Sequence, residues 1–363
     1  MRILFALPGF HLFERGAEVA LLSLASELAR GGDAVTVIGA GQPRPDTPYR
    51  FRHAAAVRRE RLERMPRLPA LRSETGWEEA SFAPGLLRAY RPRDHDVTVT
   101  CSFPFTNWVL RRPVLFGKRP PHVFVTQNGD WPAVSNDAEY RTFGCDGLVC
   151  TNPDYLEHNQ ANWRCALIPN GMDADRFTPG PSERARWGLP VRGTVVLMVS
   201  ALIETKRVAD GVRAVAQLPD AHLVVAGDGP ERDAVDRLAA ELLPGRFKRL
   251  TVGAAEMPLL YRTADAFLHL SRVESFGNVY IEALACGAPV VAHDSPRLRW
   301  IVGDDAVLLD TSDPAAVAAA LHHAIASRAT LAPRGRARAL RFAWPRVAAQ
   351  YRGFLEEVIA ATR

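Results

Sequence analysis

Strand-like and helix-like segments alternate along all 363 residues, and this rhythm constrains the fold more than any other feature of the sequence. Such alternation favours parallel sheets covered by helices. Buried strands are predicted in the first half at Arg2–Ala6, Ala34–Ile38, Asp96–Thr100, His122–Thr126 and Gly147–Cys150. They are predicted in the second half at Val195–Ser200, His222–Ala226, Arg249–Val252, Ala266–Leu270, Pro289–Ala292 and Ala306–Leu309. The sequence therefore predicts an α/β protein with two doubly wound sheets.

The run Thr178-Pro179-Gly180-Pro181 separates the two halves. Neither a helix nor a central strand can cross such a stretch, because proline lacks the N–H and glycine and proline break both elements. A chain of this length can bury two cores of ordinary domain size. We therefore expect one domain over residues 1–177 and a second over residues 178–346. An amphipathic segment, Val347–Ala361, follows them near the end of the chain.

Glu274 and Glu282 bracket a polar turn that leads from a predicted strand into a predicted helix. The amides at a helix start are unpaired and carry partial positive charge, so the turn suits an anion such as a diphosphate. The two carboxylates repel that anion and are better used to accept hydrogen bonds from sugar hydroxyls. This combination predicts a nucleotide-sugar site. The residues of the turn are Ser275, Phe276, Gly277 and Asn278.

The E-x7-E pair, within a block that contains ADAF, ESFGN, EALACGAPVV and VLLD, resembles the donor motif of retaining GT-B glycosyltransferases. The resemblance is greatest to glycosyltransferase family 4. It implies a GT-B fold, in which two Rossmann-like, doubly wound domains face each other across a cleft, with the donor on the second domain. It also implies that Glu274 contacts the transferred sugar and Glu282 the ribose. A C-terminal helix, here residues 347–363, would pack back on the first domain.

The resemblance extends to other parts of the donor site. It places Lys206 where the family neutralises the donor diphosphate, and a lysine just past a strand suits a leaving phosphate. The family has an arginine where this chain has Ala201, so Arg207 is a candidate to replace that charge. Arg15-Gly16-Ala17-Glu18 resembles the family's GGxE element. The remaining donor-site candidates are Gly16, Ala17, Gly227, Gly229 and Val252.

The acceptor side is predicted in the first domain. Family members often carry a histidine after the strand that ends near Thr126, and this chain has Gln127 and Asn128 there. An amide holds a hydroxyl but is no base at neutral pH. His11 and Asp130 are therefore the candidate catalytic bases, beside the catalytic candidates Glu274 and Lys206. The acceptor-binding candidates are His11, Glu18, Asn128 and Asp130.

Composition excludes several classes of protein. The sequence contains no run of about 18 apolar residues, and its first strand is too short for a signal peptide, so we expect a cytoplasmic protein. The five cysteines form no C-x2-C pair and are interpreted as buried small residues.

The basic, partly apolar segment Arg58–Arg72 is either a solvated surface or a peripheral contact with the inner face of an anionic membrane. Without interleaved aromatic residues it is a poor partner for nucleic acid.

The hypothesis from sequence is a retaining glycosyltransferase that moves a sugar from a nucleoside diphosphate, UDP or GDP, to an acceptor hydroxyl in glycan, polysaccharide or glycoconjugate synthesis. The acceptor could be a saccharide, a lipid-linked intermediate or a small molecule. We expect no metal and no cofactor, because a lysine and a helix start can neutralise the diphosphate and Asp94-His95-Asp96 opens a strand rather than following one. The alternatives are a GT-B nucleotide-sugar epimerase and a catalytically weak carbohydrate-binding protein.

Overall fold

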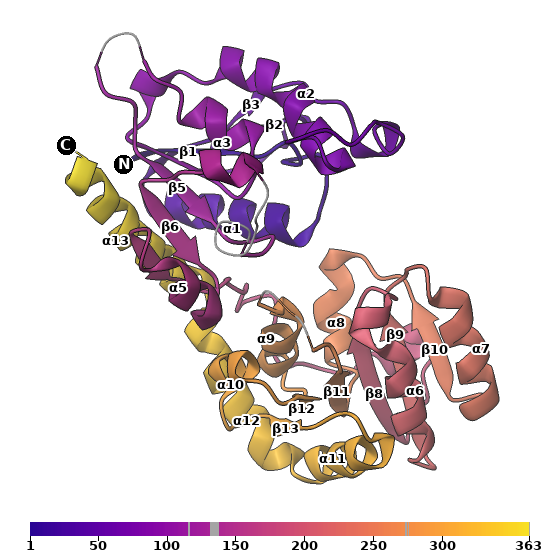
Figure 1. Cartoon of the computed structure of the whole chain (residues 1–363). Helices are drawn as coiled ribbons and strands as arrows, with labels where there is room; N and C mark the ends of the chain where they lie inside the picture. The colour runs from indigo at the N-terminus through magenta and orange to yellow at the C-terminus, as the bar shows by residue number, and fades with distance from the viewer. Residues whose placement is uncertain (115–116, 131–137, 273, 275, 363) are drawn as a thin grey trace. The chain divides into compact units, whose positions relative to one another are not determined.

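The computed structural model describes residues 1–114, 117–130, 138–272, 274 and 276–362. The chain divides into two compact units (Figure 1). The first combines Met1–Gly171 with Trp344–Arg363, and the second is Met172–Ala343. The chain therefore enters the second unit once and returns to the first for its last helix. At the point of return Gly171 packs so closely on Trp344 that a Cβ there would lie 2.2 Å from the indole ring.

Among the described residues, the sheet of the first unit has seven parallel strands in the order β3-β2-β1-β4-β5-β6-β7. The strands are β1 Arg2–Ala6, β2 Ala34–Gly39, β3 Arg50–His53, β4 Val97–Thr100, β5 His122–Val125, β6 Gly147–Cys150 and β7 Cys165–Leu167. The helices are α1 Gly16–Arg30, α2 Glu74–Ala89, α3 Phe105–Leu110, α5 Pro153–Asn159 and α13 Trp344–Thr362. The strand order reverses at β1, as in doubly wound folds.

The sheet of the second unit has six parallel strands within the described part of the chain, in the order β10-β9-β8-β11-β12-β13. The strands are β8 Thr194–Val199, β9 Ala221–Ala226, β10 Phe247–Leu250, β11 Ala266–His269, β12 Val290–His293 and β13 Val307–Leu309. The helices are α6 Val208–Ala216, α7 Arg232–Leu242, α8 Met257–Tyr261, α9 Asn278–Ala285, α10 Pro296–Val302, α11 Pro314–Ala326 and α12 Arg328–Ala339. Here the order reverses at β8.

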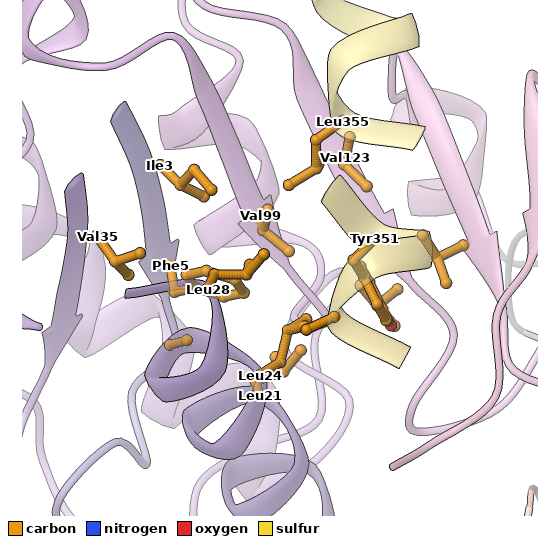
Figure 2. Packing of buried hydrophobic residues seen from close by; sticks show 14 of the residues in the cluster. Ile3, Phe5, Leu21, Leu24, Leu28, Val35, Val99, Val123, Tyr351 and Leu355 are labelled. Carbon is orange, nitrogen blue, oxygen red and sulfur yellow. The ribbon is translucent and has the colours of Figure 1, made fainter. Parts of the chain in front are cut away.

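Alternating side chains of β1 pack into hydrophobic clusters on the two faces of the first sheet. Ile3 and Phe5 pack against α1 and α13, whereas Leu4 packs on the opposite face in a cluster with residues of α2 and α3. Figure 2 shows Tyr351 and Leu355 of α13 packed among residues of α1 and the central strands. The C-terminal helix is thus part of the core of the first unit. Burial of its apolar face stabilises the unit by roughly 25 cal/mol per Å² of apolar surface removed from water.

Four aspartates that directly precede a parallel strand share one structural role. Each accepts one hydrogen bond from an arginine side chain and one from a nitrogen at the amino end of the neighbouring strand. They are Asp33, Asp96, Asp146 and Asp265. The strand nitrogen is the terminal ammonium of Met1 for Asp33 and a main-chain N–H for the other three. Such bonds satisfy donors that a sheet leaves unpaired at its amino edge.

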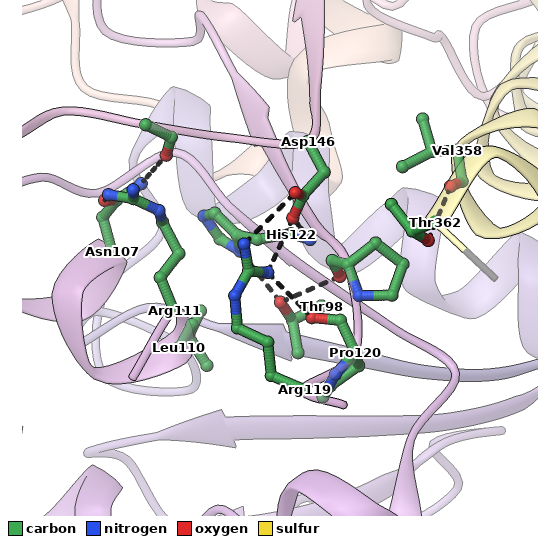
Figure 3. Close-up of polar contacts among 12 residues, drawn as sticks. Thr98, Asn107, Leu110, Arg111, Arg119, Pro120, His122, Asp146, Val358 and Thr362 are labelled. Atoms are coloured by element: carbon green, nitrogen blue, oxygen red, sulfur yellow. Dashed lines mark hydrogen bonds and ion pairs between the residues drawn. The ribbon is translucent and has the colours of Figure 1, made fainter. Parts of the chain in front are cut away.

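Figure 3 shows the arrangement at Asp146. Its Oδ2 accepts from Arg119 at 2.6 Å and from the main-chain N–H of His122 at 2.7 Å. Asp96 has its carboxylate engaged by Arg2 in the same way, with guanidinium and main-chain bonds of 2.7 and 2.8 Å. The carboxylate of Asp96 is therefore committed to holding strands together at the edge opposite to the ligand side.

The predicted strands match the observed ones closely, with three differences. The predicted strand at Arg249–Val252 lies two residues earlier, at Phe247–Leu250. Two edge strands were not predicted, β3 and β7. β3 reads Arg-Phe-Arg-His, and none of the residues of either strand is fully buried, so neither shows the apolar run by which buried strands are recognised.

Candidate functional site

Lys206 and Glu274 meet where the strand order of the second unit reverses. Lys206 lies in a short turn after β8 and Glu274 in the loop after β11, and these strands are neighbours in the sheet. Open parallel sheets bind ligands beyond the carboxyl ends of the strands at this point. The ammonium of Lys206 contacts Oε1 of Glu274, and about a fifth of each side chain is exposed. Two predicted donor-site residues are therefore brought together.

His269, the last residue of β11, binds the same carboxylate. Its Nε2 lies 2.9 Å from Oε1 of Glu274. Burial raises the pKa of Glu274, but the hydrogen bonds and charges of His269 and then Lys206 outweigh it and lower that pKa to about 2. Glu274 is thus an ionised acceptor at neutral pH.

The turn after Glu274 requires glycine and leads into α9. Gly277 has φ 83°, in the left-handed region, and a Cβ there would lie 2.6 Å from the ring of Tyr280. Phe276 is buried in the core of the unit, and Asn278 begins the helix. The predicted Ser275 lies outside the described residues. The positive end of α9 therefore starts next to Glu274, as an anion site requires.

Glu282 lies on α9 and faces α8. Its Oε2 accepts a hydrogen bond from the hydroxyl of Tyr261 at 2.9 Å. Burial raises the pKa of Glu282 to about 6, although Tyr261 and the charge of Arg176 act in the opposite direction. The hydroxyl of Tyr261 therefore holds one oxygen of a carboxyl whose pKa lies above its ordinary value.

The glycines after β9 allow close contact between two loops. A Cβ at Gly227 would lie 1.9 Å from the carbonyl oxygen of Ser200, and one at Gly229 would lie 2.5 Å from that of Leu202. The main chain of these loops is joined by the bonds from Ser200 N to Ala226 O and from Leu202 N to Asp228 O. This contact fixes the loop that leads to Lys206. Val252 is half-buried just after β10.

Arg207 is committed to contacts within the second unit. Its guanidinium binds Asp210 at 2.9 Å and the hydroxyl and carbonyl oxygens of Thr311, each at 2.8 Å. Its backbone is left-handed, with φ 54°, at the start of α6. A phosphate contact by Arg207 would require these bonds to break. The arrangement therefore favours a structural role for this arginine.

Glu18 lies at the carboxyl edge of the first sheet. α1 begins at Gly16, followed by Ala17, and the Glu18 carboxylate packs on the loop after β1, where a Cβ at Gly9 would lie 2.0 Å from its Oε1. Burial raises the pKa of Glu18 above its ordinary value. The guanidinium of Arg15 lies 3.9 Å from the carboxylate. Glu18 is thus a buried acid at the ligand edge, with a cation beside it.

His11 is held inside the first unit by both ring nitrogens. Nδ1 lies 2.9 Å from the carbonyl oxygen of Gln42, and Nε2 lies 2.8 Å from the hydroxyl of Tyr49. The ring stacks on Phe51, with centroids 4.1 Å apart. Burial lowers the pKa of His11. These contacts favour a structural role, because no ring nitrogen is left to take a proton from a substrate.

Asp130 is buried between two donors from α5. Its Oδ2 is 2.6 Å from Nδ1 of His158, and its Oδ1 accepts a bond of 2.5 Å from Asn159. Asn128 lies two residues earlier, with its amide nitrogen 3.9 Å from Sγ of Cys101. Asp130 therefore positions the α5 side chains, and a role as base would compete with these bonds.

Three polar contacts of the site could not be read from the motifs alone. His269 belongs to an otherwise apolar strand, and its only signal in the sequence is its place just before Glu274. Tyr261 meets Glu282 from another helix, 21 positions away. Arg297 of α10 contacts the carbonyl oxygen of Glu274 from 23 positions away. Each depends on tertiary packing that the spacing of residues does not reveal.

The described residues contain no cluster of three or more histidine, cysteine, aspartate or glutamate side chains that could hold a metal ion. Within the same residues, no helix is both long and apolar enough to span a bilayer.

Both units match family profiles. Residues 181–338 match the family described as Glycosyl transferases group 1, and residues 15–176 match Glycosyltransferase Family 4. The lipopolysaccharide core biosynthesis glycosyltransferase LpsE of Rhizobium meliloti is 30% identical over 237 residues, which cover 63% of this chain and 68% of LpsE.

Two further comparisons describe length and fold. The D-inositol 3-phosphate glycosyltransferase of Geodermatophilus obscurus is 35% identical over 247 residues, or 60% of this chain and 55% of that protein. The chain thus spans about half the length of that relative. The structure of Anabaena HepE, in complex with UDP and glucose, matches 98% of this chain and 100% of its own with a TM-score of 0.75 at 20% identity, which shows a shared fold.

The family profiles, the identity to LpsE and the two Rossmann-like units agree. The chain belongs to the group 1, or family 4, glycosyltransferases and has their GT-B fold.

Proposed function

We propose that the protein is a retaining glycosyltransferase that uses a nucleoside diphosphate sugar. The observation that carries the proposal is the contact between Lys206 and Glu274 at the reversal of strand order, beside the start of α9. A cation and a helix start suit a diphosphate, and an ionised carboxylate suits sugar hydroxyls. A nucleoside diphosphate sugar carries both kinds of partner on one molecule, its diphosphate and its hydroxyls.

In this proposal each donor group binds one part of the ligand. Lys206 and the first turn of α9 hold the diphosphate, with Phe276, Gly277 and Asn278 supplying main-chain amides. Glu274 accepts a hydroxyl of the transferred sugar. Glu282, eight residues after Glu274, accepts hydrogen bonds from the ribose hydroxyls. Its fixed contact with Tyr261 supports this role.

The reaction breaks the bond between the anomeric carbon and the diphosphate, whose oxygen keeps the electron pair. The acceptor oxygen forms the new bond to that carbon, and the hydroxyl proton is released with the nucleoside diphosphate. Lys206 and the α9 amides stabilise the charge that develops on the leaving phosphate. These groups do the electrostatic work that a divalent metal does in other transferases, so we propose a metal-independent reaction.

The donor base is proposed to be uracil or guanine. The Anabaena structure contains UDP, and the names of the two relatives refer to D-inositol 3-phosphate and to lipopolysaccharide core biosynthesis. These names support an acceptor that carries several hydroxyls, in glycoconjugate synthesis. On the acceptor side we propose Glu18 as the main hydroxyl-binding group, because it is a buried acid at the ligand edge of the first sheet.

The segment Arg58–Arg72 is proposed to contact the anionic inner face of a membrane. Met65 and Leu68 of this segment are 40% and 46% exposed among its arginines, a combination that suits lipid headgroups and the acyl boundary. Sedimentation with vesicles that contain 30% phosphatidylserine tests this contact. Binding should fall when Met65 and Leu68 are changed to serine, and equal binding by wild type and variant would contradict it.

The proposed activity is tested by incubating the protein with UDP and GDP sugars, with and without a polyol acceptor, and analysing the products. Transfer predicts acceptor-dependent release of the nucleoside diphosphate and a glycoside with the donor's anomeric configuration. Isomerised donor without acceptor would favour an epimerase. Failure of every nucleoside diphosphate to bind would favour a carbohydrate-binding protein.

A further inference from the structure

His269 is a buried polar residue in a strand that is otherwise apolar. It ends β11 and is 2% exposed. Its ring lies parallel to that of Phe267, with centroids 6.1 Å apart, and meets the ring of Tyr280 edge to face at 5.0 Å. The imidazole is therefore fixed between the strand and the helix that flank the Glu274 turn.

The two nitrogens of His269 differ in their partners. Nε2 binds Oε1 of Glu274, whereas Nδ1 is buried and has no hydrogen-bond partner among the described residues. A buried polar atom without a partner destabilises the folded state. A leucine would fill similar space between Phe267 and Tyr280 without that cost. The contact between Nε2 and Glu274 is the one polar interaction that favours histidine at this position within the described structure.

Lys206 and His269 donate to the same oxygen of Glu274. In the proposed function, Lys206 must also bind the donor diphosphate. A lysine ammonium has three N–H donors on a flexible stem, so it can turn toward the phosphate. His269 cannot follow, because rings on both sides hold it. It is therefore the donor that stays on Glu274 when the diphosphate binds.

We propose that His269 is a positioning residue that holds Oε1 of Glu274 in place and leaves Oε2 to accept a hydroxyl of the transferred sugar. This inference rests on the proposed function of the donor site. The same contact has an electrostatic effect, since His269 contributes the largest lowering of the Glu274 pKa. Loss of this contact would remove that lowering, so Glu274 would take up a proton more readily.

The test compares His269→Gln, whose amide nitrogen can reach the position of Nε2, with His269→Asn, which is too short, and His269→Leu. For each we would measure kcat and KM for the nucleotide sugar, Kd for the nucleoside diphosphate alone and the pH profile of kcat/KM. His269→Leu and His269→Asn should lose about 10- to 100-fold in kcat/KM, the value of a hydrogen bond to a charged group. His269→Gln should recover most of the activity.

The nucleoside diphosphate should bind all variants within about twofold of wild type, because its proposed partners are Lys206 and the α9 amides and not His269. The activity of His269→Leu should also fall more steeply than that of wild type between pH 8 and 5. Melting curves establish that each variant is folded. Equal kcat/KM values and equal pH profiles for the Gln and Asn variants would overturn the positioning role of His269 and leave the proposed function intact. Absence of nucleoside diphosphate binding by the wild type would instead overturn the proposed function on which it rests.

Discussion

Lys206 and Glu274 are 68 positions apart, yet the ammonium of one contacts the carboxylate of the other. They meet because β8 and β11 are neighbours at the point where the strand order reverses. The pair is mutually neutralised before any ligand binds. A bound diphosphate would therefore displace Glu274 as the ion-pair partner of Lys206, and it would not meet an unpaired charge. Donor binding should therefore involve an exchange of ion-pair partners within a site that is already formed.

The pH dependence of donor affinity should report on Glu282. Its pKa of about 6 means that the carboxylate takes up a proton as the pH falls from 7 to 5. A protonated carboxyl is a weaker acceptor for ribose hydroxyls, so affinity for the nucleotide sugar should fall over that range. In Glu282→Gln the dependence should disappear. Calorimetric titration at pH 5, 6 and 7 checks this, and an unchanged slope in the variant would remove Glu282 from the nucleotide site.

Gly277→Ala should weaken both the fold and the donor site. The left-handed backbone costs about 1–2 kcal/mol for a residue with a side chain, and the new Cβ would press on the ring of Tyr280. Thermal unfolding and nucleoside diphosphate binding measure the two effects. Gly253→Ala is the matched control, because a Cβ there meets no atom within 4 Å. Equal melting temperatures for the two variants would contradict a structural requirement for glycine at position 277.

Glu79 should make the stability of the protein depend on pH. It is fully buried, and burial raises its pKa from 4.5 to about 7, although bonds from Ser102 and the main chain at Thr106 oppose that shift. A raised carboxyl pKa means that the folded state binds the proton more tightly than the unfolded state. The resulting stability is present below pH 4.5 and is lost as the pH rises toward 7.

Glu79→Gln should remove this dependence, which amounts to at most about 3 kcal/mol between pH 4.5 and 8. Denaturant unfolding of wild type and variant at both pH values measures it. The difference in free energy of unfolding between the two proteins should change with pH. A constant difference would show that Glu79 does not titrate in this range.

Asp146→Asn should destabilise the first unit without affecting the donor site. The carboxylate joins Arg119 to the main chain at His122, and those bonds together lower its pKa in spite of burial. Its contribution is therefore present above pH 4 and lost as the pH falls below its ordinary value of 3.8. We expect a loss of about 1–3 kcal/mol at pH 7, with unchanged nucleoside diphosphate affinity. The more exposed Asp94→Asn should have little effect, and equal effects of the two changes would contradict this role.

The sequence predicted the parts of the fold that depend on local pattern. Apolar runs revealed the central strands, and the Pro-Gly-Pro run lies close to the boundary at which the chain enters the second unit. The contact between Lys206 and Glu274 is consistent with the motifs that suggested both residues. The central strands could be predicted because burial leaves a direct trace in the spacing of apolar residues.

Features that arise from packing between distant segments were not predictable in this way. The edge strands β3 and β7 lack an apolar run. The contacts of Arg207 with Thr311 and of His11 with Tyr49 span 104 and 38 positions, and they occupy groups that the motifs had suggested for substrate. Ser275 lies outside the described residues.

The most direct test of the donor site is the affinity of Lys206→Met for nucleoside diphosphate, measured by calorimetry beside Lys248→Met as a control from the same unit. Wild type and Lys248→Met should bind UDP or GDP with equal Kd, and Lys206→Met should bind about 10- to 100-fold more weakly, because a charge-assisted hydrogen bond to phosphate is lost. Equal affinity of all three proteins, each shown to be folded, would contradict the assignment of this site to the donor diphosphate.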